Sequence, residues 1–121
     1  MADDQFERGL KVRREVLGDV YVDRALAAGN PVTTEFQDLL TRYAWGEIWA
    51  RPGLDRKTRS VITVALLSAL GQEQELAAHL RGALNNGLTR DEIKEVLLQT
   101  AIYCGIPAAN AAFRVAAEVL M

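Results

Sequence analysis

Apolar residues recur at spacings of three, four and seven positions along most of the chain, and no stretch of useful length alternates apolar with polar residues. Such spacing places apolar side chains on one face of an α-helix, whereas strict alternation is typical of a strand. The pattern therefore predicts an all-α fold. Half of the 121 residues are hydrophobic, which is enough for one compact core, so residues 1–121 are expected to form a single domain.

The first part of the chain is predicted to hold two short helices followed by a longer one. Residues 4–28 should form the short pair, because Gly9 and Gly18 weaken a continuous helix. The dipeptide Asn30-Pro31 then breaks the chain, since proline cannot continue a preceding helix. The longer helix is expected after this break.

Thr33 or Thr34 is the predicted N-cap of the longer helix, because a threonine hydroxyl can accept a hydrogen bond from the first helical turn. The helix should end near Trp49, since Pro52 and Gly53 follow it closely. The two halves of the chain are therefore expected to join in a loop.

An apolar run, SVITVALLSAL, indicates the next helix at residues 60–70. Asp55 is its predicted N-cap. Gly71 is its predicted end, because glycine readily adopts the left-handed conformation that terminates many helices. The nearly continuous apolar surface of this helix predicts burial on most sides.

The following helix carries His79 and should end at Asn86 and Gly87. Thr89 and Glu92 then form a capping-box sequence, in which each side chain accepts a hydrogen bond from a backbone N–H group of the other residue. This is a specific start signal for one more helix before the last.

Gly105 and Pro107 separate a last helix, AANAAFRVAAEVLM, from the one before it. Its alanines lie around most of the helix. The helix therefore carries more apolar surface than the rest of a small monomer usually covers. We therefore expect a homo-oligomer. The alternative is a central helix enclosed by its own chain, and the sequence does not separate the two.

His79 is the only histidine, and it shares one predicted helix face with polar and small residues. The glutamate one turn earlier could hold the imidazole or raise its pKa, and the small residues one turn later leave room for a ligand. The alternative is a solvated surface histidine or a satisfied buried one. The face consists of Gln72, Glu75, His79, Gly82, Ala83 and Asn86.

Glu47 continues an apolar helical stripe, so a functional interpretation is a partly desolvated acid or base. The alternative is that the helix end lets Glu47 turn to water. Trp45 and Trp49, one turn apart, fit packing, although an aromatic wall at Trp45 would suit a planar ring substrate. The stripe comprises Phe36, Leu40 and Tyr43.

Arginines near the proline-glycine loop are the candidates for binding an anionic substrate group. Arg51, Arg56 and Arg59 flank this loop, although exposed and solvated arginines are the commoner outcome. Arg81 is only two positions from His79, about 200° around a helix, so the two side chains cannot easily share one ligand.

Charge and composition exclude several classes of protein. Fourteen basic and sixteen acidic residues give a net charge of −2, and no basic block indicates nucleic-acid binding. The apolar run at residues 61–70 is too short to span a membrane. Cys104, the only cysteine, excludes an intrachain disulfide and fits a helical core position. The start, MADDQFERG, lacks the apolar core of a signal peptide, so the cytoplasm is expected.

Two long stretches, WGEIWARPGLDRKTRSVITVALLSAL and HLRGALNNGLTRDEIKEVLLQTAIYCGIPAANAAF, resemble the carboxymuconolactone decarboxylase family over nearly the whole chain. The resemblance implies the helical bundle of the alkylhydroperoxidase D-like superfamily, a ring-like homohexamer, and neither metal nor organic cofactor. It also implies a small-molecule lactone substrate: decarboxylation of 4-carboxymuconolactone to 3-oxoadipate enol-lactone in the protocatechuate branch of the β-ketoadipate pathway.

The redox branch of that superfamily carries a glutamate, two cysteines and a histidine. In this chain His79 stands at the histidine position, but Gln72 and Glu75 replace the two cysteines and Ser60 replaces the glutamate. Without two thiols there is no disulfide to cycle. Peroxidase or disulfide-reductase activity is therefore not expected.

The implied reaction suggests a role for each candidate residue. His79 would be the general acid that protonates the ring carbon after CO2 leaves, and Glu47 or Glu75 would orient it or relay the proton. Asn86 would donate a hydrogen bond to the lactone oxygen, and an arginine would hold the substrate carboxylate. Two alternatives stay open: an enzyme acting on another lactone or by proton transfer alone, and a non-catalytic helical assembly protein.

Overall fold

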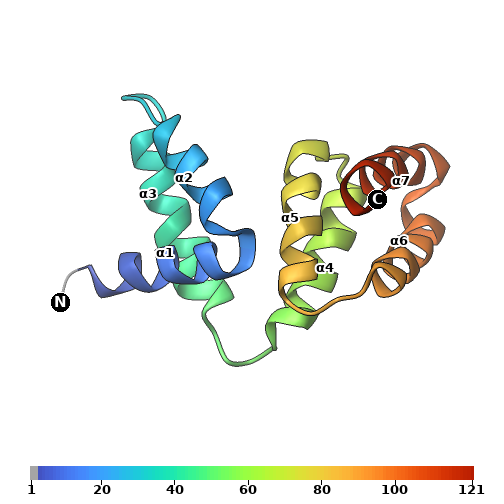
Figure 1. Cartoon of the computed structure of the whole chain (residues 1–121), viewed down its shortest axis with the longest axis horizontal. Helices are drawn as coiled ribbons and strands as arrows, with labels where there is room; N and C mark the ends of the chain where they lie inside the picture. Colours follow the sequence, from blue (N-terminus) through green and yellow to red (C-terminus); the bar gives the residue numbers. More distant parts are fainter. Residues whose placement is uncertain (1–2) are drawn as a thin grey trace. The chain divides into compact units, whose positions relative to one another are not determined.

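The computed structural model describes residues 3–121, in which all regular structure is helical (Figure 1). The predicted all-α class is confirmed. None of the helices in this part of the chain is long and apolar enough to cross a membrane. The elements are α1 (Asp4–Leu17), α2 (Asp19–Ala27), α3 (Thr34–Leu40), the π-helix η1 (Thr41–Trp49), α4 (Arg56–Ala69), α5 (Glu73–Asn85), α6 (Arg90–Cys104) and α7 (Ile106–Leu120).

The helices gather into two compact units, and the boundary between Leu54 and Asp55 lies at the end of the predicted loop. The N-terminal unit contains α1, α2, α3 and η1. The C-terminal unit contains α4 to α7 and a continuous apolar core.

In the N-terminal unit, the predicted division of residues 4–28 into two helices is confirmed, and the break is at Gly18. This glycine has a φ of 89°, in the left-handed region that favours glycine. Gly9 is not a break. It lies inside α1, where the helix crosses η1, and its lack of a side chain serves packing instead of flexibility.

The crossing of α1 and η1 brings two backbones into direct contact. A Cβ atom added at Gly9 would lie 2.0 Å from the Thr41 carbonyl oxygen, and one added at Gly46 would lie 2.4 Å from the Gln5 carbonyl oxygen. Neither backbone can be displaced as easily as the end of a side chain. The two helices therefore pack at this distance only because both positions are glycine.

The helix predicted to run to Trp49 ends there, but its second half is a π-helix. Thr33 stands at the N-cap position of α3, yet its hydroxyl does not cap the helix. It accepts a hydrogen bond from the Asn30 N–H group, and the Asn30 side chain in turn accepts from the Thr33 N–H group. Asn30 thus organises the turn that precedes α3.

In the C-terminal unit the predicted helix starts are confirmed by their caps. Asp55 accepts a hydrogen bond of 2.7 Å from the Thr58 N–H group at the start of α4. Thr89 and Glu92 form both bonds of the capping box at the start of α6, with distances of 2.9 and 3.0 Å. These caps satisfy N–H groups that have no acceptor within the helix.

The helix ends in this unit also follow the prediction. Gly71, Gly87 and Gly105 all have positive φ values, between 70° and 99°, directly after helices. Pro107 does not precede the last helix, as the sequence suggested, but lies in its first turn. A proline is tolerated there because its missing N–H group would have had no acceptor.

The prediction that α4 is buried on most sides is wrong for the single chain. α4 and α5 lie side by side (Figure 1), and the face of α4 that is fully buried carries Ser60, Val64 and Ser68. Leu66 and Leu70 on other faces are 55% and 68% exposed. An apolar sequence showed that this helix has much apolar surface, but not that its own chain covers that surface.

We predict that Gly9→Ala destabilises the protein by about 3 kcal/mol, because the added methyl group meets backbone atoms and forces the helices apart. Gly53→Ala is the matched control, since nothing lies within 4 Å of a Cβ at that position. The control should change stability by less than about 1 kcal/mol. Urea unfolding followed by circular dichroism measures both, and equal effects would contradict the close crossing.

Candidate functional site

His79 lies on α5, the helix of the C-terminal unit that packs against α4, α6 and α7. Its neighbours Leu76 and Leu80 are 1% and 0% exposed and belong to the apolar core. The imidazole is partly buried beside them, and its Nδ1 atom is shielded from water. The packing that anchors α5 therefore also removes much of the hydration of the ring.

Burial lowers the pKa of His79 from 6.5 to about 4, and the negative charge of Glu75 raises the pKa by less. The sequence prediction that Glu75 favours the protonated ring is right in direction, but desolvation has the larger effect. In the free protein at neutral pH, His79 is therefore a neutral imidazole.

The rest of the predicted His79 face is divided between solvent and core. Gln72 and Glu75 are exposed at the start of α5. Gly82 and Ala83 are buried, and Ala83 belongs to the apolar core. Ala83 therefore contributes to the packing of α5, and the expectation that these small residues leave space for a ligand beside the ring stays a prediction.

Asn86 caps the C-terminal end of α5 and connects it to α4. Its side-chain amide donates a hydrogen bond of 2.8 Å to the hydroxyl of Ser60, which is completely buried, and a longer one of 3.4 Å to the Arg56 carbonyl. Both hydrogen bonds use the amide hydrogens of Asn86. In this arrangement the amide oxygen is the atom that remains to accept a hydrogen bond from a ligand.

Arg56 and Arg59 occupy the first turn of α4, in the unit that also holds His79. Both are partly buried. Because the Arg56 carbonyl accepts from Asn86, the start of α4 and the end of α5 lie together. Arg56 therefore lies where α4 contacts Asn86, and Arg59 follows three residues later in the same helix.

Trp45, Glu47 and Arg51 belong to the N-terminal unit. Trp45 is 5% exposed and its ring stacks on Trp49 with 5.1 Å between ring centroids, so it forms part of the core of that unit. Glu47 accepts a hydrogen bond of 3.3 Å from Arg51, and both side chains are about half exposed.

The apolar helical stripe that Glu47 continues is not buried in the single chain. Phe36 and Tyr43 are 60% and 62% exposed, and the buried residues of η1 lie on a different face. The Glu47 side chain is therefore solvent-exposed, which is the simpler of the two interpretations that the sequence allowed.

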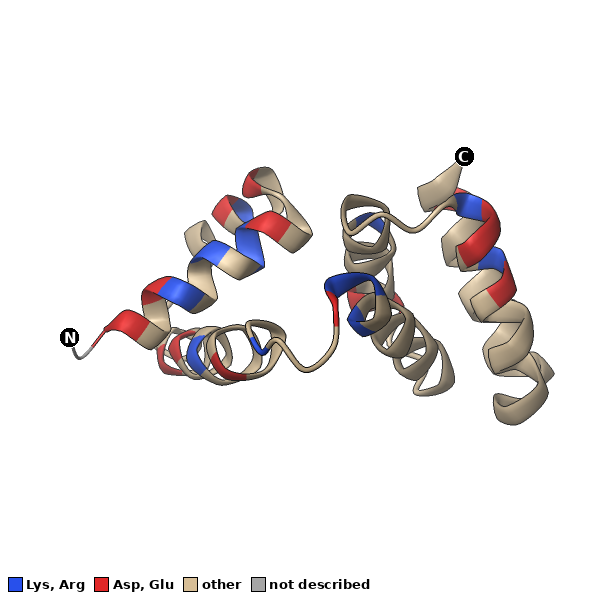
Figure 2. Ribbon diagram, turned by 90° about the horizontal axis from the view of Figure 1, so that it is seen from below, with Lys and Arg blue, Asp and Glu red and all other residues tan. Residues whose placement is uncertain are grey.

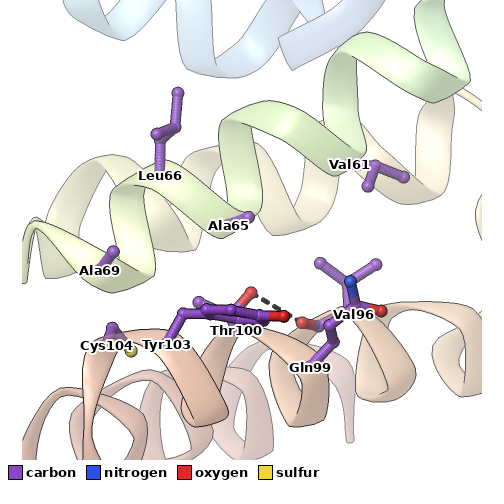
Figure 3. A pocket seen from close by; sticks show the side chains of 9 residues that line it. All are labelled: Val61, Ala65, Leu66, Ala69, Val96, Gln99, Thr100, Tyr103 and Cys104. Carbon is purple, nitrogen blue, oxygen red and sulfur yellow. Dashed lines mark hydrogen bonds between the residues drawn. The ribbon is translucent and has the colours of Figure 1, made fainter.

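A groove of about 370 Å³ lies between α4 and α6 (Figure 3), and sequence reasoning did not identify it. None of the predicted site residues lines it. Its walls are mostly apolar, and Thr100 donates its hydroxyl hydrogen to the Val96 carbonyl within the same helix. Cys104 lies at the groove and is only partly buried, in contrast to the core position expected for it. The lining residues are Val61, Ala65, Leu66, Ala69, Val96, Gln99, Thr100, Tyr103 and Cys104.

Within residues 3–121, no three acidic, histidine or cysteine side chains come close enough together to hold a metal ion. The C-terminal unit thus holds His79 with the Glu75 carboxylate one turn before it, the hydrogen-bonded Ser60–Asn86 pair, and two arginines in the first turn of α4. These groups can bind anions and move a proton, so the arrangement suits acid-base chemistry on an anionic molecule.

A family model described as the carboxymuconolactone decarboxylase family matches residues 34–118. The chain is 52% identical over 120 residues to 4-carboxymuconolactone decarboxylase of Acinetobacter baylyi, covering 98% of this chain and 90% of the relative. It is 50% identical over 102 residues to nitrosuccinic acid decarboxylase of Metarhizium robertsii, covering 84% and 71%. A 43-residue match of 46% identity to 4-carboxymuconolactone decarboxylase of Pseudomonas putida covers 36% of this chain and 90% of the relative.

We predict that the single histidine resonance of this protein titrates with a midpoint near pH 4 in the free state. Because the folded pKa lies below the unfolded value of 6.5, the unfolded chain binds a proton that the folded chain does not bind between these values. The contribution to stability is complete above pH 6.5 and is lost as the pH falls to about 4. The loss amounts to at most about 3 kcal/mol.

Proton NMR gives the titration midpoint, and urea unfolding between pH 4 and 8 gives the stability of the wild type and of His79→Gln. The variant should lack the part of the pH dependence that belongs to this imidazole. A midpoint near 6.5 would mean that the ring is hydrated.

Proposed function

Because this chain belongs to the carboxymuconolactone decarboxylase family, we propose that it decarboxylates 4-carboxymuconolactone to 3-oxoadipate enol-lactone and CO2. The observation that carries the proposal is the 52% identity to an enzyme of that name over 98% of the chain. The protein is accordingly a carboxy-lyase of aromatic catabolism, in the protocatechuate branch of the β-ketoadipate pathway. Its fold is the helical fold of the alkylhydroperoxidase D-like superfamily.

The substrate supplies its own electron sink. When CO2 leaves the ring carbon, the electron pair of the broken bond flows through the ring double bond to the lactone carbonyl and forms an oxyfuran-like dienolate. Decarboxylations without such a sink normally borrow one from a cofactor. The protein therefore has to position the lactone, stabilise the oxyanion and deliver one proton to carbon.

His79 is the proposed proton donor. In the free protein its pKa is about 4, so the neutral ring has to gain its proton when the substrate is present. The lactone brings negative carboxylates, and a nearby negative charge favours the imidazolium. Binding of the substrate thus raises the pKa of His79 and charges the acid when it is needed.

The other groups of the C-terminal unit have supporting roles in this proposal. Glu75, one turn before His79, favours the protonated ring. Arg56 or Arg59 binds the substrate carboxylate. Asn86 breaks its hydrogen bond to the Ser60 hydroxyl and donates the same amide hydrogen to the lactone oxygen. The roles of Glu47 as a proton relay and of Arg51 as a carboxylate ligand stay proposals. Trp45 is buried and stacked on Trp49, so a role as an aromatic wall would require its ring to become exposed.

Self-association into a homohexamer is also part of the proposal. Residues 96–113 contain no charged side chain, and Figure 2 shows most of α6 and the start of α7 without charge. Ile102, Tyr103 and Ile106 in this segment are 79%, 85% and 68% exposed. A continuous uncharged surface of this kind favours contact with another protein surface over water. We propose the cytoplasm as the place where the assembly works.

The relative named for nitrosuccinic acid favours a second candidate, decarboxylation of a different acid. A nitro group can accept the electron pair of a departing carboxylate just as a conjugated lactone can. Both substrates fit a site that supplies a proton and no cofactor. Comparing the rates of CO2 release from the two acids separates these two functions. Proton exchange without CO2 release would instead indicate an enzyme that acts by proton transfer alone.

We predict that His79→Ala lowers kcat for γ-carboxymuconolactone by about a hundred- to ten-thousandfold, the usual contribution of a general acid. Purified protein is mixed with freshly generated lactone, and CO2 release and ultraviolet absorbance are followed. Arg81→Ala is the matched control, because Arg81 is exposed on the same helix and points away from the His79 face.

Unchanged turnover by a correctly assembled His79→Ala protein would show that another group delivers the proton. Substituting Arg51, Arg56 and Arg59 one at a time tests the carboxylate contact. The arginine that binds the substrate should raise KM selectively.

We predict a mass of about 80 kDa in solution, six times that of the 13.3 kDa chain. Ile102→Lys should reduce this mass, because a buried charge opposes a contact through the uncharged segment. Val32→Lys is the control, since Val32 is 88% exposed but lies in the other unit. Sedimentation velocity measures all three proteins, and a wild-type monomer would refute the assembly.

A further inference from the structure

The π-helix η1 is an unusual element, and its cause lies in the contact with α1. A π-helix pairs each carbonyl with the N–H group five residues later, and it is rare at this length because the α-helix is normally preferred. η1 extends from Thr41 to Trp49. Nothing in the composition of this segment excludes an α-helix, so tertiary contacts must select the wider helix.

The first contact is the glycine crossing. A Cβ on Gly9 would lie 2.0 Å from the Thr41 carbonyl oxygen and 2.8 Å from the Gly46 nitrogen, so α1 meets both groups at one point. In an α-helix, positions five residues apart are about 140° apart around the axis. In a π-helix they form the i→i+5 pair. α1 therefore packs directly against the carbonyl and nitrogen of an i→i+5 pair of η1.

The second contact is a pair of side-chain hydrogen bonds from α1 to carbonyls of η1. The Gln5 amide donates to the Arg42 carbonyl at 2.9 Å, and the Arg8 Nε–H group donates to the Gly46 carbonyl at 3.1 Å. The Arg51 N–H group donates to the Ile48 carbonyl, only three residues earlier, which ends the i→i+5 pattern. Arg8 thus donates to the Gly46 carbonyl at the end of the π-helix, where the Arg51 N–H group bonds to Ile48 instead.

The register of η1 decides where the Glu47 carboxylate points. Replacing one π-helical turn by an α-helical turn shifts the following side chains by about one residue, which is about 100° around the axis. In the observed register Trp45 and Trp49 are buried, while Glu47 faces outward and pairs with Arg51. A change of register would move the carboxylate away from this position.

We propose that Arg8 and Gln5 are positioning residues for decarboxylation: they hold η1 in its π-helical register and so fix the direction of Glu47. The inference rests on the proposed role of Glu47 in proton relay. It assigns no contact with substrate to Arg8 or Gln5. Their effect on the reaction passes through the backbone of η1.

The test is a double-mutant cycle with Arg8→Ala and Glu47→Gln, in which kcat and KM for γ-carboxymuconolactone are measured. Arg8→Ala alone should lower kcat about tenfold or more, with KM within about twofold, because displacing an acid-base group affects the chemical step. In the Glu47→Gln background, Arg8→Ala should have no further effect on kcat. Arg8→Lys, which restores a donor, should recover part of the loss.

Lys11→Ala is the matched control, because Lys11 is exposed on the same helix. Thermal unfolding of every variant shows that the proteins are folded at the assay temperature, and Gln5→Ala replaces Arg8→Ala if the latter is unfolded. An equal loss of kcat in both backgrounds, or no loss in either, would overturn the inference. A wild type without decarboxylase activity would overturn the proposed function, whereas a fully active Glu47→Gln would overturn only the role of Glu47 and the inference built on it.

Discussion

Burial of one face of α5 is the constraint on which the C-terminal unit depends. Leu76, Leu80 and Ala83 have almost no exposed surface, and the helices around α5 pack on them. His79 lies between two of these core residues, so its ring loses water as a direct result of the packing. The same burial stabilises the fold and disfavours the imidazolium. In the proposed mechanism, the negative charge of the bound lactone favours the protonated ring and so offsets the effect of burial.

Helix boundaries were predictable because they depend on neighbouring residues. The Asp55 cap, the Thr89–Glu92 capping box and the glycine at position 71 all act within one turn of a helix end. The π-helix was not predictable, because the α1 contacts that select it come from residues more than thirty positions away in the sequence. Helical periodicity assumes 3.6 residues per turn, so it could not show the wider register of residues 41–49.

The candidate site was predictable in its residue types but not in its electrostatics. The single histidine and the glutamate one turn before it could be identified from spacing. The sign of the pKa shift could not, because it depends on how much water the core removes from the ring. Asn86 was correctly placed at the end of α5, but its partner Ser60 lies 26 residues away and only the fold brings them together.

Three of the four positions that carry the redox chemistry of the superfamily are occupied by other residue types in this chain. The resemblance places Ser60 where the redox branch has a glutamate, and the structure shows it fully buried and bonded to Asn86. A glutamate there would bring a carboxylate into a space that a small hydroxyl now fills. Gln72 and Glu75, at the two cysteine positions, are exposed and cannot form a disulfide. Of the four redox positions only His79 keeps its residue type, and this agrees with the proposal that one imidazole carries the acid-base chemistry.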